Sequence, residues 1–362
     1  MTSAARQHGA AFLIFIFLLS LAALGVFFSG LNAQTQRLEN DKRTADALAK
    51  AMSALTGYAV SDSNRPGELP CPDQNNDGRL TAADLLGSNC RALVGRLPLR
   101  VLNLPDLRDG NGDRLWYALS NNFHANGSTR INADTVGALT ITGNTTVGSV
   151  VAVVFSPGKP LDTQNRGGVG ANNVVNFLEG ENADADSVYV QALESAGFND
   201  RLVFISSATL LSAVGKRVLN ETRVALENFK EDFGYFPYAT TFQNPNTSDF
   251  KSDPGVMAGH LPAEDSNLED LLPSWIEGQR WHWGIYYAVA PDFVQGATQT
   301  CGGGCLTLLS TATPNNDKPA VVILTGAALN GQTHPSASTA DYLEDPENLD
   351  GNNVFTARPV NS

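Results

Sequence analysis

The longest apolar run of the chain lies near its start. No charged residue occurs between Ala10 and Leu31, and the short segment before this run carries Arg6. About 20 apolar residues in a helix are enough to cross a bilayer. The pattern therefore predicts a single membrane span over residues 10–31. Because a basic flank stays on the cytoplasmic side, we expect the bulk of the chain to lie outside.

A cleaved secretory signal is the alternative explanation of this run. Such signals have an apolar core of roughly 7–15 residues and small residues at the cleavage site. The run here is longer, and Leu31-Asn32-Ala33 is a poor cleavage triplet. The run therefore favours an anchor over a secretory signal.

The helical pattern continues beyond the apolar run. Residues 34–58 contain no proline and a single glycine, Gly57. A loose apolar stripe follows one helical face at Leu38, Ala45, Leu48, Met52 and Leu55. Spacings of this kind keep one face of a helix apolar. We therefore expect one continuous helix that is half membrane span and half scaffold for the following domain.

From the end of this helix onward, a set of apolar segments occurs twice in the same order, which predicts an internal duplication. Each copy has a helix, an aromatic strand, a fully apolar strand and a short segment that ends in Leu-Glu. In the first copy these are residues 51–55, 114–119, 150–155 and 176–179, and in the second 224–229, 281–289, 320–324 and 341–344. A last pair matches residues 199–205 with 352–355. Short β-branched runs bounded by turn residues are typical of central strands.

These patterns predict an α+β fold with a long N-terminal helix and two tandem modules, each a helix packed on an antiparallel sheet. The expected division is a leader over residues 1–9, a membrane and scaffold helix over 10–58, a first module over 59–206 and a second over 207–362. The internal helix of the second module is expected from about Ala208 to Glu231, with Ser207 as its N-cap.

Composition mainly excludes functions. The chain has 37 acidic and 24 basic residues and a net charge of −13, so nucleic acid is not an expected partner. It has no HExxH, no G-x-S-x-G, no P-loop and no strand-linked G-x-G-x-x-G. We therefore expect no enzymatic activity. His282 is expected on a strand surface, and the nearby tryptophans and tyrosines in the core, an exposed recognition patch being the alternative.

The four cysteines predict two disulfides, since an even number in an exported domain favours pairing. Chain order favours Cys71–Cys90 and Cys301–Cys305, although four cysteines allow three connectivities. The second pair would close a small ring through three glycines. A CxxxC metal site is the alternative for that pair, but no histidine lies nearby.

Residues 73–84 have the spacing of a calcium loop. Oxygen-bearing groups stand at loop positions 1, 3, 5, 7, 9 and 12, and Gly78 stands at position 6. A hard cation takes six to eight oxygen ligands, and the glycine permits the sharp bend. The candidate ligands are Asp73, Asn75, Asp77, the carbonyl of Arg79, Thr81 and Asp84.

The segment that follows, residues 81–86, is expected to form a helix, as in the EF-hand and dockerin loops that this stretch resembles. A turn rich in Asp and Asn is the alternative interpretation. A second acidic segment, residues 106–113, is predicted as a hairpin turn, with a metal site as the alternative.

The start of the chain resembles the type IV pilins and the pseudopilins of type II secretion. The shared features are a basic leader, Gly9 before a cleavage point at Ala10, and a long helix that is half anchor and half scaffold. Most members carry Glu as the fifth residue after the cut, where this chain has Ile14. The resemblance therefore implies a minor, tip-type subunit rather than a polymer-forming one.

The resemblance also implies partners and location. They are other pilin-like subunits, a prepilin peptidase that cuts after Gly9, and the inner membrane, with the C-terminal modules in the periplasm or on a surface filament. Calcium is the expected cofactor. The alternatives from other classes are a signal-anchored protein that binds glycan or protein through its second module, and an exported hydrolase.

Overall fold

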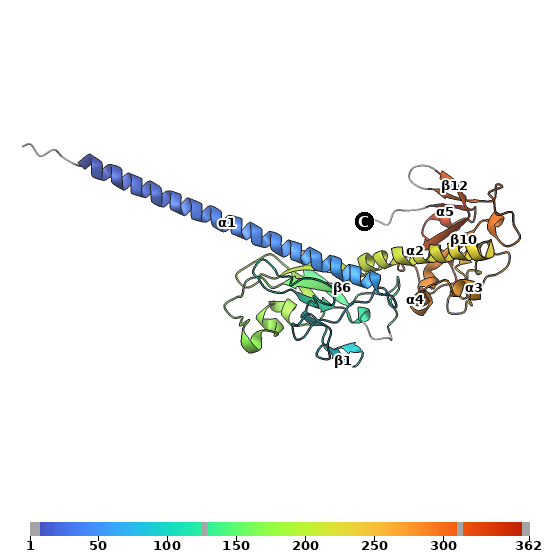
Figure 1. Ribbon diagram of the computed structural model, residues 1–362, viewed down its shortest axis with the longest axis horizontal. Helices are drawn as coiled ribbons and strands as arrows, with labels where there is room; N and C mark the ends of the chain where they lie inside the picture. The colour runs from blue at the N-terminus through green and yellow to red at the C-terminus, as the bar shows by residue number, and fades with distance from the viewer. Residues whose placement is uncertain (1–7, 125–128, 310–313, 357–362) are drawn as a thin grey trace, which may run out of the picture.

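The structure is a computed structural model that describes residues 8–124, 129–309 and 314–356, without the side chains of residues 8–12, 22–33, 169 and 314. Its longest element is α1 (His8–Ser61), one unbroken helix of 54 residues. At 1.5 Å per residue this helix is about 80 Å long. Its first half projects away from the rest of the molecule, and its second half lies along a sheet (Figure 1). The predicted continuous helix is confirmed.

The apolar face of α1 differs in part from the predicted stripe. Leu48 and Leu55 are buried as expected, whereas Leu38 and Ala45 are exposed. The buried face is completed by small residues, Ala47, Ala51 and Ala59. Alanine lets the helix axis approach the sheet closely, because it adds little bulk between the two. The buried face of α1 begins at Thr44, and one turn earlier Asp41 forms an ion pair with Arg201 of the sheet at 2.8 Å.

Over the residues that the structure describes, no helix meets the length and hydropathy required of a membrane span. The predicted span, residues 10–31, lies in part outside the described side chains.

The first half of the molecule is built on a sheet of six strands. The strands are β3 (Val94–Arg96), β4 (Trp116–Leu119), β5 (Leu139–Gly143), β6 (Val147–Ser156), β7 (Val188–Gln191) and β8 (Arg201–Ser206). Their order is β3-β4-β6-β5-β7, and β8 pairs with β6. All neighbours are antiparallel except β5 and β7. A separate hairpin joins β1 (Leu85–Leu86) to β2 (Asn89–Cys90).

Strand β6 is the centre of this sheet. Its first part pairs with β5 and its later part with β4 and β8. Val151 and Val154 pack in the core that includes α1, whereas Val153 and Phe155 pack in a second core on the opposite face. Burial on both faces explains why this strand is a continuous apolar run rather than an alternating one.

Helix α2 (Ser207–Phe233) follows β8 directly. Its N-cap is Ser206, whose Oγ accepts a hydrogen bond from the amide of Thr209, so the predicted cap at Ser207 is wrong by one residue. The helix ends at Gly234, which has a φ of +81°. Glycine adopts this left-handed conformation without steric cost, which makes it a common helix terminator.

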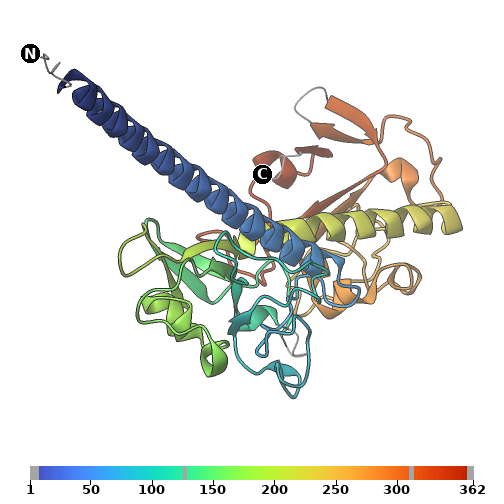
Figure 2. The ribbon, with the colours of Figure 1, turned by 60° about the vertical axis from the view of Figure 1, so that its left-hand side comes forward.

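Arg217 of α2 closes the end of α1. Its Nη1 donates to the carbonyl oxygens of Val60 and Asp62, each at 2.6 Å. The last carbonyls of a helix have no partner within the helix. The two helices lie side by side at this point (Figure 2).

The second half has two small sheets. One has the order β13-β10-β9 and the other β12-β11-β14. Their strands are β9 (Ala258–His260), β10 (Ile285–Val289), β11 (Leu306–Leu309), β12 (Pro314–Lys318), β13 (Ala320–Leu324) and β14 (Val354–Thr356). Short helices α3 (Ser266–Glu269), α4 (Ser274–Gly278) and α5 (Pro346–Leu349) lie in the connections. Helix α2 packs on β13 as α1 packs on β6.

The two halves share one strand order. If β12 and β13 are taken as a single strand interrupted at Pro319, the second half has the order β9-β10-β13/β12-β11-β14, which matches β3-β4-β6-β5-β7. Even the one parallel pair recurs, as β5 with β7 and β11 with β14. The predicted match of residues 199–205 with 352–355 is wrong, because β14 occupies the place of β7 and not of β8.

One hydrophobic core runs through both halves. It includes Leu55 of α1, Tyr117 of β4, Val214 of α2 and Tyr287 of β10. The two halves are therefore packed against each other through α1 and α2, and on the helix side of the sheets they share one interior. The fold is α+β, as predicted.

Candidate functional site

The predicted calcium loop begins as a series of turns around Asp73. This carboxylate is buried, with Oδ1 accepting from the amides of Asn75 and Asn76 at 3.0 and 2.7 Å. Its Oδ2 accepts from the amide of Gly78 at 2.5 Å. Gly78 has a φ of +79°, the left-handed conformation that the spacing predicted for position 6.

Positions 3 and 5 continue the pattern. The Oδ1 of Asn75 accepts from the amide of Asp77 at 3.1 Å, and the Oδ1 of Asp77 accepts from the amide of Arg79 at 2.7 Å. Asp77 is exposed. The side-chain oxygens at positions 1, 3 and 5 therefore each turn back onto backbone amides of the loop, which is the winding that a calcium loop has.

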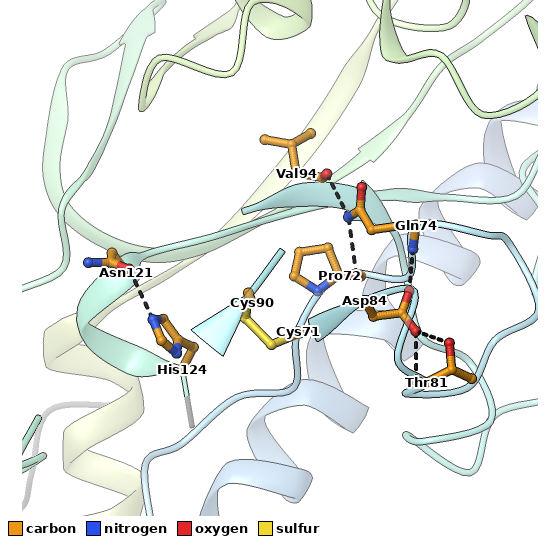
Figure 3. The surroundings of a disulfide bond; sticks show 9 residues. All are labelled: Cys71, Pro72, Gln74, Thr81, Asp84, Cys90, Val94, Asn121 and His124. Carbon is orange, nitrogen blue, oxygen red and sulfur yellow. Dashed lines mark hydrogen bonds between the residues drawn. A yellow bond between two sulfur atoms is a disulfide. The ribbon is translucent and has the colours of Figure 1, made fainter. Parts of the chain in front are cut away.

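The last positions of the loop are arranged differently. Asp84 is fully buried, and its Oδ1 accepts from the amide of Gln74 at 2.7 Å. Its Oδ2 accepts from both the amide and the hydroxyl of Thr81, each at 2.7 Å (Figure 3). Both carboxylate oxygens of Asp84 thus already have protein donors, and Thr81 is turned toward Asp84.

The predicted exit helix over residues 81–86 is wrong. Leu85 and Leu86 form strand β1 instead. The guanidinium of Arg91 donates to the carbonyls of Ala82, Ala83 and Leu85, which a helix would have used for its own hydrogen bonds. The predicted disulfide between Cys71 and Cys90 is present and fastens the same hairpin (Figure 3).

Burial raises the pKa of Asp73, although its three backbone donors favour the charged form, and the charge of Asp84 raises it further. The loop therefore holds two buried carboxyl groups close together. A cation beside them would remove this repulsion, which is the electrostatic argument for metal binding here.

The second acidic segment is a turn, as predicted. Asp109 is buried, and its carboxylate accepts from the amides of Asn111 and Asp113 and from the hydroxyl of Ser156. The neighbouring Gly110 lies against the backbone of Asn40 in α1, where a Cβ would be only 2.1 Å from the carbonyl oxygen. This turn fixes α1 to the sheet.

Another acidic group was not predicted from the sequence. Glu181, Asp184 and Asp186 place one carboxylate oxygen each within 4.8 Å of the others, and all three are exposed. The only signal was the spacing of acidic residues in a polar stretch. Such spacing is common on surfaces, so it points to no ligand.

The second predicted disulfide, Cys301–Cys305, is also present. Asp292 holds the ring that it closes, since its Oδ2 accepts from the amides of Gly302 and Gly304 at 2.8 and 3.1 Å. The disulfide and these two hydrogen bonds together fix the backbone of the ring.

His282 is not on a strand surface. It lies in a short 3₁₀ turn (Trp281–Gly284) and is buried, which lowers its pKa to about 4. Burial also lowers the pKa of His260. Trp275, Trp281 and Tyr287 are core residues, as expected, whereas Trp283 is half-buried.

Another histidine, His334, joins the two halves. The Nδ1 of His334 lies 2.7 Å from an oxygen of Asp134, and its Nε2 lies 2.6 Å from the carbonyl oxygen of Asp341. Both ring nitrogens thus face acceptors. The ring is stacked on Tyr342.

The predicted cleavage residues Gly9 and Ala10 are in the backbone of α1, in the part whose side chains fall outside the described residues. The side chain of Ile14, at the position where most pilins have Glu, is 60 % exposed. No family model, curated protein or solved structure matches this chain.

Proposed function

We propose that this protein is a non-catalytic structural subunit of a pilin-like filament, of the minor, tip-associated kind. It is inserted in the inner membrane through residues 10–31 and exposes both halves outside the cytoplasm. The observation that carries the proposal is helix α1. At one end it packs into the hydrophobic core against the first sheet, and at the other it has no protein partner among the described residues.

The free end of α1 supports membrane insertion. Its eight large apolar side chains between Leu13 and Leu21 are each about half or more exposed. A contiguous apolar surface of this size is unusual on a soluble protein and needs a cover of lipid or of another helix. An inserted subunit would have lipid around it first and neighbouring helices after assembly.

The two halves support the interpretation as two pilin-like modules that arose by duplication. Besides the strand order, one local feature recurs. Asn182 donates to the carbonyl of Val190 and accepts from its amide, and Asn348 does the same with Thr356. Each asparagine stands at the third position of a short helix, eight residues before its partner. A coincidence of position, spacing and bonding favours common descent.

Within this proposal, Gly9 and Ala10 flank the cleavage point of a prepilin peptidase, and other pilin-like subunits are the partners. The presence of Ile14 in place of Glu favours a subunit without a neighbour above it. A calcium ion would be held by Asp73, Asn75, Asp77 and the carbonyl of Arg79, and would stabilise the turn. Asp84 and Thr81 would support the loop through their own hydrogen bonds.

N-terminal sequencing of the mature protein, isolated from cells that express a prepilin peptidase, tests the proposal. A chain that begins at Ala10 supports it, and Gly9→Val should then abolish the cut. Gly57→Ala is the matched control, because a Cβ at Gly57 meets nothing within 4 Å. An uncut leader in the wild-type protein would contradict the proposal and favour the signal-anchored binding protein.

A further inference from the structure

A cavity of about 310 Å³ lies where the two halves meet. Its walls come from the segment 130–134 of the first half, the 3₁₀ turn at Trp281–Gly284, and the loops after β13. The volume is at the lower end of the range for small-molecule sites. It is the size of a single sugar ring or a similar small group.

Two arginines line this cavity without counter-ions. Among the described residues, neither Arg130 nor Arg280 forms an ion pair, whereas Arg114 and Arg166 do. Both also border a second hollow, where Glu264 and Glu277 remain beyond ion-pair distance. The cavity wall therefore carries two arginines against one carboxylate, in a protein whose net charge is −13.

The guanidinium of Arg280 is held in place. Its Cζ lies 4.1 Å from the centre of the Trp283 ring, and its backbone is left-handed, with a φ of +62°. A cation over an indole face is stabilised by the ring and has less freedom to turn away. Partial burial and the charge of Arg130 both lower the pKa of Arg280, and the two arginines line the same cavity.

Trp281 also lines this cavity and is 2 % exposed. Its indole Nε1 is fully buried, so this group does not reach the cavity. The one carboxylate in the cavity wall, Asp134, is engaged by His334 and by the amide of Ala328. Both contacts are to Oδ1, and within the described residues Asp134 forms no ion pair with Arg130 or Arg280.

We propose that this cavity binds an oxyanion group, a carboxylate or a phosphate, of a small ligand. Arg280 and Arg130 donate to the anion, and Trp281 forms part of the cavity wall. A planar guanidinium matches either anion through two parallel hydrogen bonds. The inference goes beyond the proposed filament role and does not depend on it, because it rests on residues outside α1.

Titration of the full-length chain with inorganic phosphate, with glucuronate and with neutral glucose tests the proposal by calorimetry. Phosphate or glucuronate should bind saturably and glucose should not, and which anion binds more tightly identifies the source of the group. Arg130→Gln and Arg280→Gln should each weaken binding about tenfold or more, as expected for a lost charged hydrogen bond. Arg223→Gln, an exposed arginine on α2, is the control of equal charge and should leave binding unchanged.

A second readout does not depend on the arginine variants. The chain has four tryptophans, so an ¹⁵N spectrum shows four indole signals, and Trp281→Phe identifies one of them. That signal should shift on anion addition while the Trp116 signal stays in place. Absence of anion binding in the wild type, or equal binding in both arginine variants and the control, would overturn the proposal.

Discussion

Asn182 and Asn348 occupy equivalent places in the two halves of the molecule, and each clamps both backbone groups of the residue eight positions later. They differ in burial: Asn182 is fully buried, and Asn348 is partly exposed. Asn182 also donates to Asp200 at 3.1 Å, so the same clamp stands in a buried polar network in one half and near the surface in the other.

Replacing these asparagines by alanine should destabilise the protein unequally. Asn182→Ala leaves the amide and carbonyl of Val190 without partners inside the protein, at a cost of about 2–3 kcal/mol. Asn348→Ala should cost about 1 kcal/mol, because water can replace the lost bonds. Urea unfolding of the two variants measures the difference. Equal losses would show that burial of the clamp does not matter.

A matched pair of tyrosines provides a second test. The hydroxyl of Tyr287 in β10 donates to the carbonyl of Pro237 at 3.0 Å, whereas the hydroxyl of Tyr117 in β4 is buried without a partner among the described residues. Tyr287→Phe should cost about 1 kcal/mol, and Tyr117→Phe should be neutral or stabilising. Thermal unfolding compares them. A larger loss for Tyr117→Phe would reveal a bond that the described residues do not show.

The free energy of unfolding should fall as the pH rises, because of one buried carboxyl group, that of Asp200. Burial and the neighbouring Glu179 raise the pKa of Asp200 from 3.8 to about 8. The folded state thus favours the protonated form, and this contribution to stability is complete below about pH 4 and is lost as the pH rises toward 8.

The free energy of unfolding of Asp200→Asn, measured between pH 4 and 8, should lack this decline. Relative to wild type the variant should gain at least about 1 kcal/mol across the range, since one pKa unit corresponds to about 1.4 kcal/mol. Asp232→Asn, an exposed carboxylate at the end of α2, should follow the wild-type curve. A constant difference between wild type and Asp200→Asn would contradict the protonated assignment.

Calcium should raise the melting temperature through the loop at residues 73–79. Addition of a chelator should lower it in the wild-type protein, and Asp77→Ala should abolish the response. Asp184→Ala is the control for the exposed acidic group at residues 181–186, and this variant should still respond to the chelator. If Asp184→Ala abolishes it and Asp77→Ala does not, the ion lies at the other group; without any chelator effect, the loop is a plain turn.

Much of the fold followed from local patterns in the sequence. A proline-free segment with helical spacing predicted α1, and apolar runs bounded by turns predicted β6 and β13, because those signals depend on neighbours in the chain. The match of β14 with β8 failed for the same reason. Residues 199–205 and 352–355 both begin with Asn and contain a Val-Phe pair, so they look alike in sequence. The strand with which β14 pairs is set instead by the path of the whole chain.

The candidate sites were predictable to different degrees. The turns around Asp73 follow from spacing, since each bond joins residues two to five positions apart. The orientation of Asp84 does not, because it depends on Arg91 and a disulfide that pull the following segment into a hairpin. Arg130 and Arg280 are far apart in sequence and meet only in the folded chain, so no linear pattern connects them.

The cap that Arg217 places on the end of α1 has a consequence for synthesis. The first half lacks its closing arginine, and β6 lacks part of its apolar cover, until residues 207–233 have been made. A ribosome-bound chain that ends before this point contains every strand of the first sheet but lacks α2, which packs on it. The native first half is therefore completed only after α2 has emerged, and biogenesis of the two halves is sequential but not independent.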